Sequence, residues 1–198
     1  MDPLSQGAVG AIAPQFIISR KRLGVAALFG LFAGIAPDLD VLIRSEEDPL
    51  MVLEYHRQFT HSLIFIPIGG LIIGFLMYWL FGRRWGIGFK LSWLICSIGL
   101  GTHGLLDACT SYGTVMFWPF SEIRVAWSII SIVDPLFTLP ILLFLIFSII
   151  RKSKLLVYMG IFWLIAYLLL ATYNRNTALE IVTRIAEERG HKTKKLDV

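Results

Sequence analysis

Charged residues are scarce in this sequence. Only 16% of its 198 residues are Asp, Glu, Lys or Arg, whereas 56% are hydrophobic, and the mean hydropathy is +0.71. This leaves too little polar surface to cover a water-soluble globule of this length. The composition therefore excludes a soluble domain and indicates an integral membrane protein.

Cysteine is also rare, and the apolar runs lack period-two alternation. Cys96 and Cys109 lie 13 residues apart on one predicted helix, about 20 Å at 1.5 Å per residue, which is too far for a disulfide. Without alternation the runs do not resemble the strands of a membrane barrel. Their backbone groups are therefore expected to be satisfied within helices.

Five apolar runs approach or exceed the roughly 20 residues that cross a bilayer as a helix. They cover residues 24–43, 62–81, 88–109, 129–150 and 155–173. We therefore predict an all-α fold, a polytopic membrane helical bundle with about five transmembrane helices.

Two further segments predict helices that do not cross the membrane. The apolar run 7–18 is only 12 residues long, contains Pro14 and precedes the basic residues 20–22, which favours a short interfacial or re-entrant helix. Since the basic group follows the apolar run, the order is not that of a secretory signal peptide, and we expect no cleavage. Residues 174–190 mix apolar and charged side chains, which predicts an amphipathic tail helix resting on the membrane.

Basic residues form short groups between the apolar runs rather than one stripe with interleaved aromatics, which argues against nucleic-acid binding. By the positive-inside rule, the groups in 20–22, 83–90 and 151–154 mark these connections as cytoplasmic. The connections 44–61 and 110–128 carry few basic residues and should face the other side. Five spans would place the basic tail on that side as well, against the rule.

Ionisable residues near the apolar runs are few, and this topology brings them to one membrane face, because odd spans end and even spans begin on the same side. They are Asp38, Asp40, His56, His61, His103, Asp107 and Asp134. Polar groups are costly near hydrocarbon and are candidates for function. Imidazoles mixed with carboxylates suit a divalent ion, zinc foremost, with manganese or iron as alternatives. His103 and Asp107, four residues apart, would share one helical face.

Simpler interpretations remain open for several of these residues. Asp134 precedes a proline and fits a regular helix N-cap. His103 and Asp107 could instead form a buried pair that holds two helices together. Arg57 and Arg124 lie on the same predicted face, where a guanidinium either holds an anionic group such as phosphate or contacts lipid phosphates.

Four short motifs follow one another on apolar flanks. They are Pro37-Asp38-Leu39-Asp40, His56-Arg57-x-x-Thr60-His61-Ser62, His103-x-x-x-Asp107 and Asp134-Pro135. In this order the chain resembles the predicted membrane-bound metal-dependent hydrolases typified by the bacterial inner-membrane protein YdjM. The resemblance implies a metal-dependent hydrolase, distantly related to zinc-dependent phospholipase C and P1-type nucleases, and hence a phosphoester substrate.

The chain departs from this family pattern at two places. Many members have Thr-His near the N-terminus where this chain has Ser5-Gln6, and many have His after the PDxD motif where this chain has Val41. Two possible ligands are therefore absent, which leaves the number of ions open at one or two. Asp2 and Gln6 could still approach the site.

The predicted function is hydrolysis of an ester or phosphoester, lipid or lipid-linked, at the non-cytoplasmic surface of a bacterial inner membrane. The expected metal ligands are Asp38, Asp40, His56, His61, His103 and Asp107. Arg57 and Arg124 would hold the anionic group. Asp134 would orient a ligand or accept a proton, and Thr60 would support a ligand from outside. Residues 1–150 would form the membrane-embedded core with this site, and residues 151–198 the last transmembrane helix and basic tail.

Two other functions fit parts of the pattern. A divalent-cation transporter or channel would place ligands at mid-membrane and on both faces. A non-catalytic membrane protein with a structural metal would have a closed coordination shell. In all three cases membrane lipid is the expected partner, and the sequence makes no prediction of oligomeric state.

Overall fold

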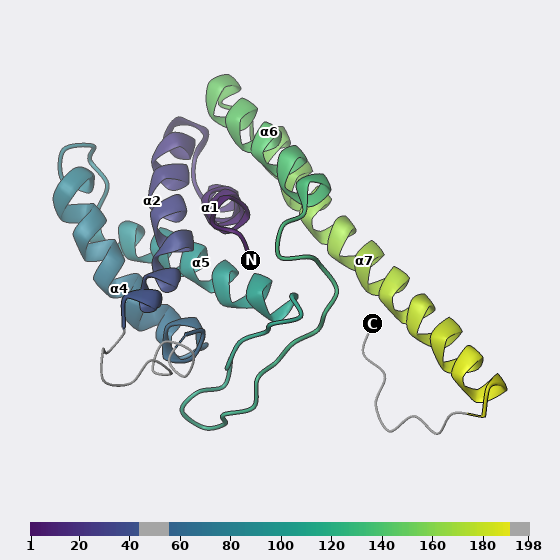
Figure 1. The fold of residues 1–198 in the computed structure, drawn as a ribbon. Coiled ribbons are helices and arrows are strands. Elements are labelled where there is room, and N and C mark those ends of the chain that lie inside the picture. Colours follow the sequence, from purple (N-terminus) through teal and green to yellow (C-terminus); the bar gives the residue numbers. More distant parts are fainter. Residues whose placement is uncertain (44–55, 191–198) are drawn as a thin grey trace.

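The computed structural model describes residues 1–43 and 56–190, and these residues are almost entirely helical or in turns, with one isolated β-bridge between Thr114 and Val125. The α-helices are α1 Pro3–Ile12, α2 Leu23–Ile35, α4 Phe65–Met77, α5 Phe89–Ala108, α6 Pro135–Arg151 and α7 Lys154–Glu188 (Figure 1). Shorter turns are the 3₁₀ helices η1 Ala13–Phe16, η2 Arg20–Arg22, η3 Ala36–Leu42 and η4 Phe59–His61, and the π-turn η5 Tyr78–Gly82. The predicted all-α bundle is confirmed.

Within the described residues, four segments are long and apolar enough to cross a membrane. They are Arg20–Leu42, Phe65–Gly82, Phe89–Ala108 and Lys154–Glu188. The remaining predicted span forms α6, which has 17 residues and is about 26 Å long. It begins at Pro135 rather than at residue 129, because the Asp134 side chain accepts a hydrogen bond from the Phe137 N–H and caps the helix there.

The N-terminal run differs from the predicted interfacial or re-entrant helix. Helix α1 is buried within the bundle from Ser5 to Ile12 and lies antiparallel to α2. A Cβ on Gly30 would lie 2.1 Å from the Gly10 carbonyl oxygen, so only glycine allows this close approach. Because other helices cover α1, it does not have to meet lipid over its own length.

The C-terminal part of the bundle is a hairpin of α6 and α7. Helix α7 continues without interruption to Glu188, so the predicted tail helix is an extension of the last span (Figure 1). Its 35 residues extend about 52 Å, well beyond the roughly 30 Å hydrocarbon core. The charged half of α7 therefore projects from the membrane-spanning part.

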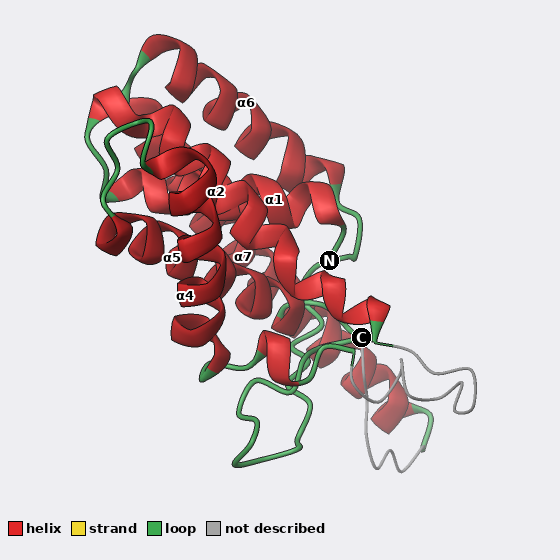
Figure 2. Ribbon diagram, turned by 90° about the vertical axis from the view of Figure 1, so that its left-hand side faces the viewer, coloured by secondary structure: helices red, strands yellow, loops and turns green. Residues whose placement is uncertain are grey.

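Connections sort to two ends of the bundle. In Figure 1 the turns after η1, between α4 and α5, and between α6 and α7 lie at the upper end, while the loop 109–134 lies at the lower end. Figure 2 shows the same loop projecting from one end of the helices. The basic groups at 20–22, 83–90 and 151–154 are therefore separated from the end where α5 finishes, which is where the candidate site lies.

Candidate metal centre

Four side chains with metal-ligating chemistry meet at the end of α5. They are Asp38 from η3, His61 from η4, and His103 and Asp107 from α5, with one ligand atom from each within 4.8 Å of all the others. His61, His103 and Asp107 are buried, and the Asp38 side chain is 21% exposed. Three elements distant in sequence thus form one group that could bind a divalent metal.

A glycine brings η4 close to α5. A Cβ on Gly104 would lie 2.5 Å from the carbonyl oxygen of His61, closer than real side chains allow. Gly104 lies between His103 and Asp107 on α5, so the backbone of His61 can approach where both α5 ligands project.

The two histidines point their Nε2 atoms at each other, 2.9 Å apart. His103 Nδ1 donates to the Gly34 carbonyl oxygen at 2.6 Å. His61 Nδ1 donates to Thr60 Oγ1 at 2.9 Å, and Thr60 in turn donates to Asp40 Oδ2 at 2.7 Å. With each Nδ1 carrying the hydrogen, both neutral rings present Nε2 lone pairs to the same point. This arrangement requires a proton or a cation between them.

Two carboxylate oxygens complete the group. Asp107 Oδ2 lies 3.1 Å from His61 Nε2 and 3.5 Å from His103 Nε2, and Asp38 Oδ1 lies 3.3 Å from His103 Nε2 and 3.7 Å from His61 Nε2. Ligand bonds of about 2.0–2.1 Å in a tetrahedral zinc site separate the donor atoms by roughly 3.3 Å. Asp107 Oδ2 is buried and has no hydrogen-bond partner among the described residues. The donor set and its spacing therefore fit one divalent ion.

The protonation of His61 reflects the surrounding negative charge. Burial by itself would lower the pKa of its imidazole, but the carboxylates close to it, that of Asp107 first, outweigh burial and raise the pKa to about 10. The same negative charge that raises this pKa would also favour a bound cation.

Asp40 and His56, both predicted as ligands, lie one layer outside this group. Asp40 Oδ1 pairs with His56 Nδ1 at 2.7 Å, and its Oδ2 accepts hydrogen bonds from Thr60 and from the Arg57 N–H, the latter at 3.0 Å. The cause is the 3₁₀ turn of η3, which directs Asp38 to the centre and Asp40 to the backbone before η4. Asp40 therefore orients His61 through Thr60.

Two arginines flank the centre on a shared aromatic ring. The Cζ atoms of Arg57 and Arg124 each lie 4.8 Å from the centre of the Tyr112 ring. Arg57 is 7% exposed, adopts φ of 60°, and places Nε 3.2 Å from Asp107 Oδ2. Its Nε and Nη1 have no hydrogen-bond partner in the described structure. The sequence singled out both arginines but not Tyr112.

The sequence comparisons place this chain in a family. The family described as YdjM inner membrane protein matches residues 1–178. The chain belongs to this family. With its long apolar helices, it is a multi-pass protein of the bacterial inner membrane.

Two curated relatives are similar to this YdjM-family chain. Inner membrane protein YbcI of Escherichia coli is 36% identical over 52% of this chain and 61% of its own length. The uncharacterized protein YfhP of Bacillus subtilis is 26% identical over 67% of this chain and 39% of its own length. The chain thus spans less than two thirds of either relative. No solved structure matches it.

Three further residues of this YdjM-family chain, two at the N-terminus and one at the start of α6, differ in their relation to the four-residue group. Gln6 donates from Nε2 to Asp107 Oδ1 at 2.9 Å, and the amino group of Met1 also contacts Asp107. The signal for Gln6 was its position, because Ser5-Gln6 stands where many family members have Thr-His. Asp134 lies outside the four-residue group. Its carboxylate caps α6 and accepts a hydrogen bond from the Tyr167 hydroxyl at 2.7 Å.

Proposed function

We propose that this chain is a metal-dependent hydrolase that cleaves an ester or phosphoester at the non-cytoplasmic surface of the membrane. The observation that carries the proposal is the pair of facing Nε2 atoms with two buried or half-buried carboxylates around them. A helix-packing pair needs only one imidazole and one carboxylate. The second imidazole and second carboxylate support an ion-binding role.

Asp38, His61, His103 and Asp107 would hold the ion, zinc foremost, with manganese or iron as alternatives. A bound divalent ion supplies an activated water near neutral pH and stabilises negative charge on the ester. The chain itself fixes the two imidazoles, one through the Gly34 carbonyl and the other through Thr60. Such outer hydrogen bonds set the orientation of a ligand and strengthen its basicity.

The arginines favour an anionic substrate. Arg57 is buried beside Asp107 with two nitrogen atoms that lack hydrogen-bond partners in the described residues. Because Nε already lies against Asp107, Nη1 is the donor best suited to a phosphate oxygen. Arg124 stacks on the same Tyr112 ring and bonds to the carbonyl oxygens of Gly113 and His56 at 3.4 Å. It would therefore support Arg57 and the loop rather than act alone.

The depth of the centre favours a lipid or lipid-linked substrate. Asp38 lies at the end of one candidate span and Asp107 at the end of another. Span ends lie near the headgroup layer. Asp38 and His56, each 21% exposed, mark the side from which a substrate would enter.

The first test is the metal content of protein purified in detergent without chelator, measured by elemental analysis. We expect about one divalent ion per chain, lost in His61→Ala and in Asp107→Ala, because each variant removes one of the four ligands. Asp134→Asn is the matched control, since it alters a carboxylate that lies outside the group. A well-folded wild type that stays metal-free after reconstitution would refute the metal centre.

Hydrolysis is tested separately from metal binding. Metal-loaded protein is incubated with a chromogenic phosphodiester and with a short-chain phospholipid, and release of product is followed. Turnover that disappears with chelator and in His61→Ala would support the hydrolase. Stoichiometric metal without turnover of either substrate would favour a structural metal instead.

A further inference from the structure

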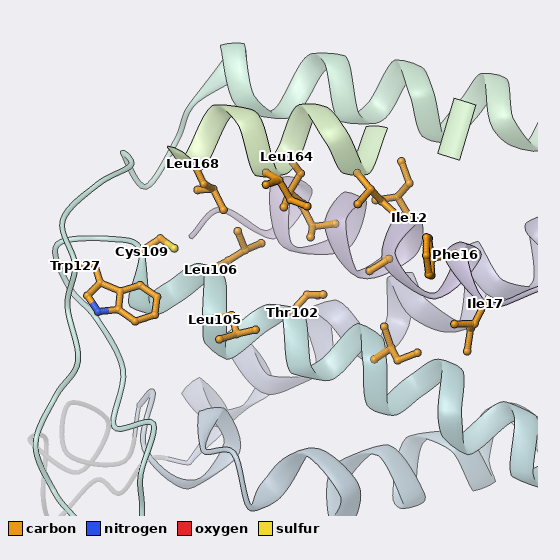
Figure 3. A pocket seen from close by; sticks show the side chains of 15 residues that line it. Ile12, Phe16, Ile17, Thr102, Leu105, Leu106, Cys109, Trp127, Leu164 and Leu168 are labelled. Carbon is orange, nitrogen blue, oxygen red and sulfur yellow. The ribbon is translucent and has the colours of Figure 1, made fainter. Parts of the chain in front are cut away.

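A long apolar groove lies on the other side of α5 from the metal centre. It is a cavity of about 580 Å³ between α5 and α7, beside α1 and η1. Figure 3 shows the side chains of Ile12, Leu105, Leu106 and Leu164 around this space. Thr102 contributes one of the few polar groups in its lining. The volume falls in the range of small-molecule and lipid sites, roughly 300–1,000 Å³.

The groove continues toward the end of the bundle that holds the metal centre. A second cavity of about 540 Å³ shares four lining residues with the first. These are Cys109, Trp127, Ile165 and Leu168. The Trp127 N–H donates to the Ala108 carbonyl oxygen at 2.7 Å, which fixes the loop against the end of α5. The two cavities therefore adjoin along α7, and together they are called the channel.

A cationic group stands at the end of this channel. Thr172 and Arg175 line the second cavity, and Arg175 is the first charged residue of α7 after Lys154. Its Nε is buried without a hydrogen-bond partner among the described residues. A buried donor without a partner is costly unless a ligand satisfies it. The channel is thus apolar along its length and positively charged at one end.

Helix packing leaves this channel open. Helix α7 packs on α6, on η1 and on α1, but only Val157 and Gly160 of its residues are buried. Apolar residues of α7 such as Leu164 and Leu168 are therefore only partly covered by protein. An occupant must be apolar over most of its length and anionic at the Arg175 end.

We propose that this channel is a phospholipid site, with an acyl chain along the apolar part and the phosphate group at Arg175. Charge complementarity selects this occupant, because a hydrocarbon chain alone would leave the buried Nε of Arg175 without a partner. The site goes beyond the proposed hydrolase and does not depend on it. α5 separates the two, with Leu105 and Leu106 on the channel side and His103 and Asp107 at the metal centre.

The test is native mass spectrometry of the full chain in detergent, with dioleoylphosphatidylglycerol as the probe and dioleoylglycerol as its phosphate-free counterpart. We expect one bound phospholipid on the wild type. Leu168→Trp fills the channel and should lower binding of both probes about tenfold. Arg175→Gln should lower binding of the phospholipid about tenfold, as for the loss of a charge-assisted hydrogen bond, and leave the diacylglycerol unchanged.

Matched controls lie on the same helix. Leu170→Trp adds the same bulk at a residue that is 56% exposed and outside the channel, and Arg189→Gln removes the same charge near the helix end. Both should bind phospholipid like the wild type. Metal content and melting temperature, measured on every variant, establish that the fold is intact.

Three results would overturn the lipid site. The first is equal phospholipid binding by Leu168→Trp and the wild type. The second is equal loss of phospholipid in Arg175→Gln and Arg189→Gln. The third is a wild-type dimer without bound lipid that Leu168→Trp converts to a monomer, because a second copy would then occupy the channel. A metal-free wild type that still binds phospholipid would refute the proposed hydrolase alone.

Discussion

The two sides of α5 show opposite ways of using the same helix. On one side, His103 and Asp107 are buried, and ring, carboxylate and backbone partners from three elements surround them. On the other, Leu105 and Leu106 face an apolar channel with one cationic end. Hydrogen bonds and ion pairs fix the side chains on the polar side, whereas the apolar side has few directional contacts. A single substitution should therefore abolish binding at the metal centre but only weaken binding in the channel.

The largest difference is expected between neighbouring residues on these two sides. His103→Ala should abolish metal binding, because it removes one of the four proposed ligands and breaks the bond to the Gly34 carbonyl oxygen. Thr102→Ala removes a hydroxyl that lines the channel and bonds only within its own helix, to Gly99. It should keep the metal. Elemental analysis of both proteins checks the contrast, and equal metal content would place the ion elsewhere.

The sequence predicted the helices and the residues that share a helical face, because hydrophobic length and residue spacing can be read from it directly. Hydrophobic length identified the membrane helices, and the spacing of His103 and Asp107 placed them on one face of α5. The shape of irregular backbone could not be predicted in the same way. Asp38 and Asp40 diverge because η3 is a 3₁₀ turn. The approach of His61 depends on Gly104, a contact between distant segments.

The burial of α1 and the full length of α7 could not be predicted from the hydrophobic pattern either. A short apolar run looks interfacial unless the small residues that let other helices cover it are recognised, here Gly10 against Gly30. The charged residues after residue 173 indicate that the chain leaves the hydrocarbon for water. The sequence alone does not show whether the helix also ends there. In the structure α7 simply continues to Glu188.

A second, smaller effect is expected one layer out from the ion. Asp40→Asn keeps the shape of the side chain but weakens its bonds to His56 and Thr60, so His61 is held less firmly. Metal affinity should fall about 10- to 100-fold. Glu122→Gln, an exposed carboxylate in the loop at the same end, is the control. Competition with a fluorescent chelator measures the metal affinity of both variants. An unchanged affinity in Asp40→Asn would show that Asp40 does not contribute to metal binding by orienting His61.

The pH dependence of metal binding should follow the proton at the centre. Because the pKa of His61 is raised to about 10 in the metal-free protein, an ion that binds below this pH must displace a proton. Affinity should therefore rise about tenfold per pH unit up to that pKa and then level off. Calorimetry in two buffers of different ionisation enthalpy should show about one proton released per ion near neutral pH. Release of no proton would mean that the ion does not bind at His61.

The smallest effect tests the residue that the structure separates from the centre. Asp134→Ala removes the cap of α6 and the bond to the Tyr167 hydroxyl. The expected cost is about 0.5–2 kcal/mol of stability, as for other N-caps, with metal content unchanged. Tyr167→Phe removes only the hydroxyl bond and should cost less, which separates the cap from the helix-to-helix contact. Thermal unfolding in detergent, followed together with elemental analysis, checks both variants. Loss of the ion in Asp134→Ala, with α6 still folded, would mean that this carboxylate takes part in metal binding.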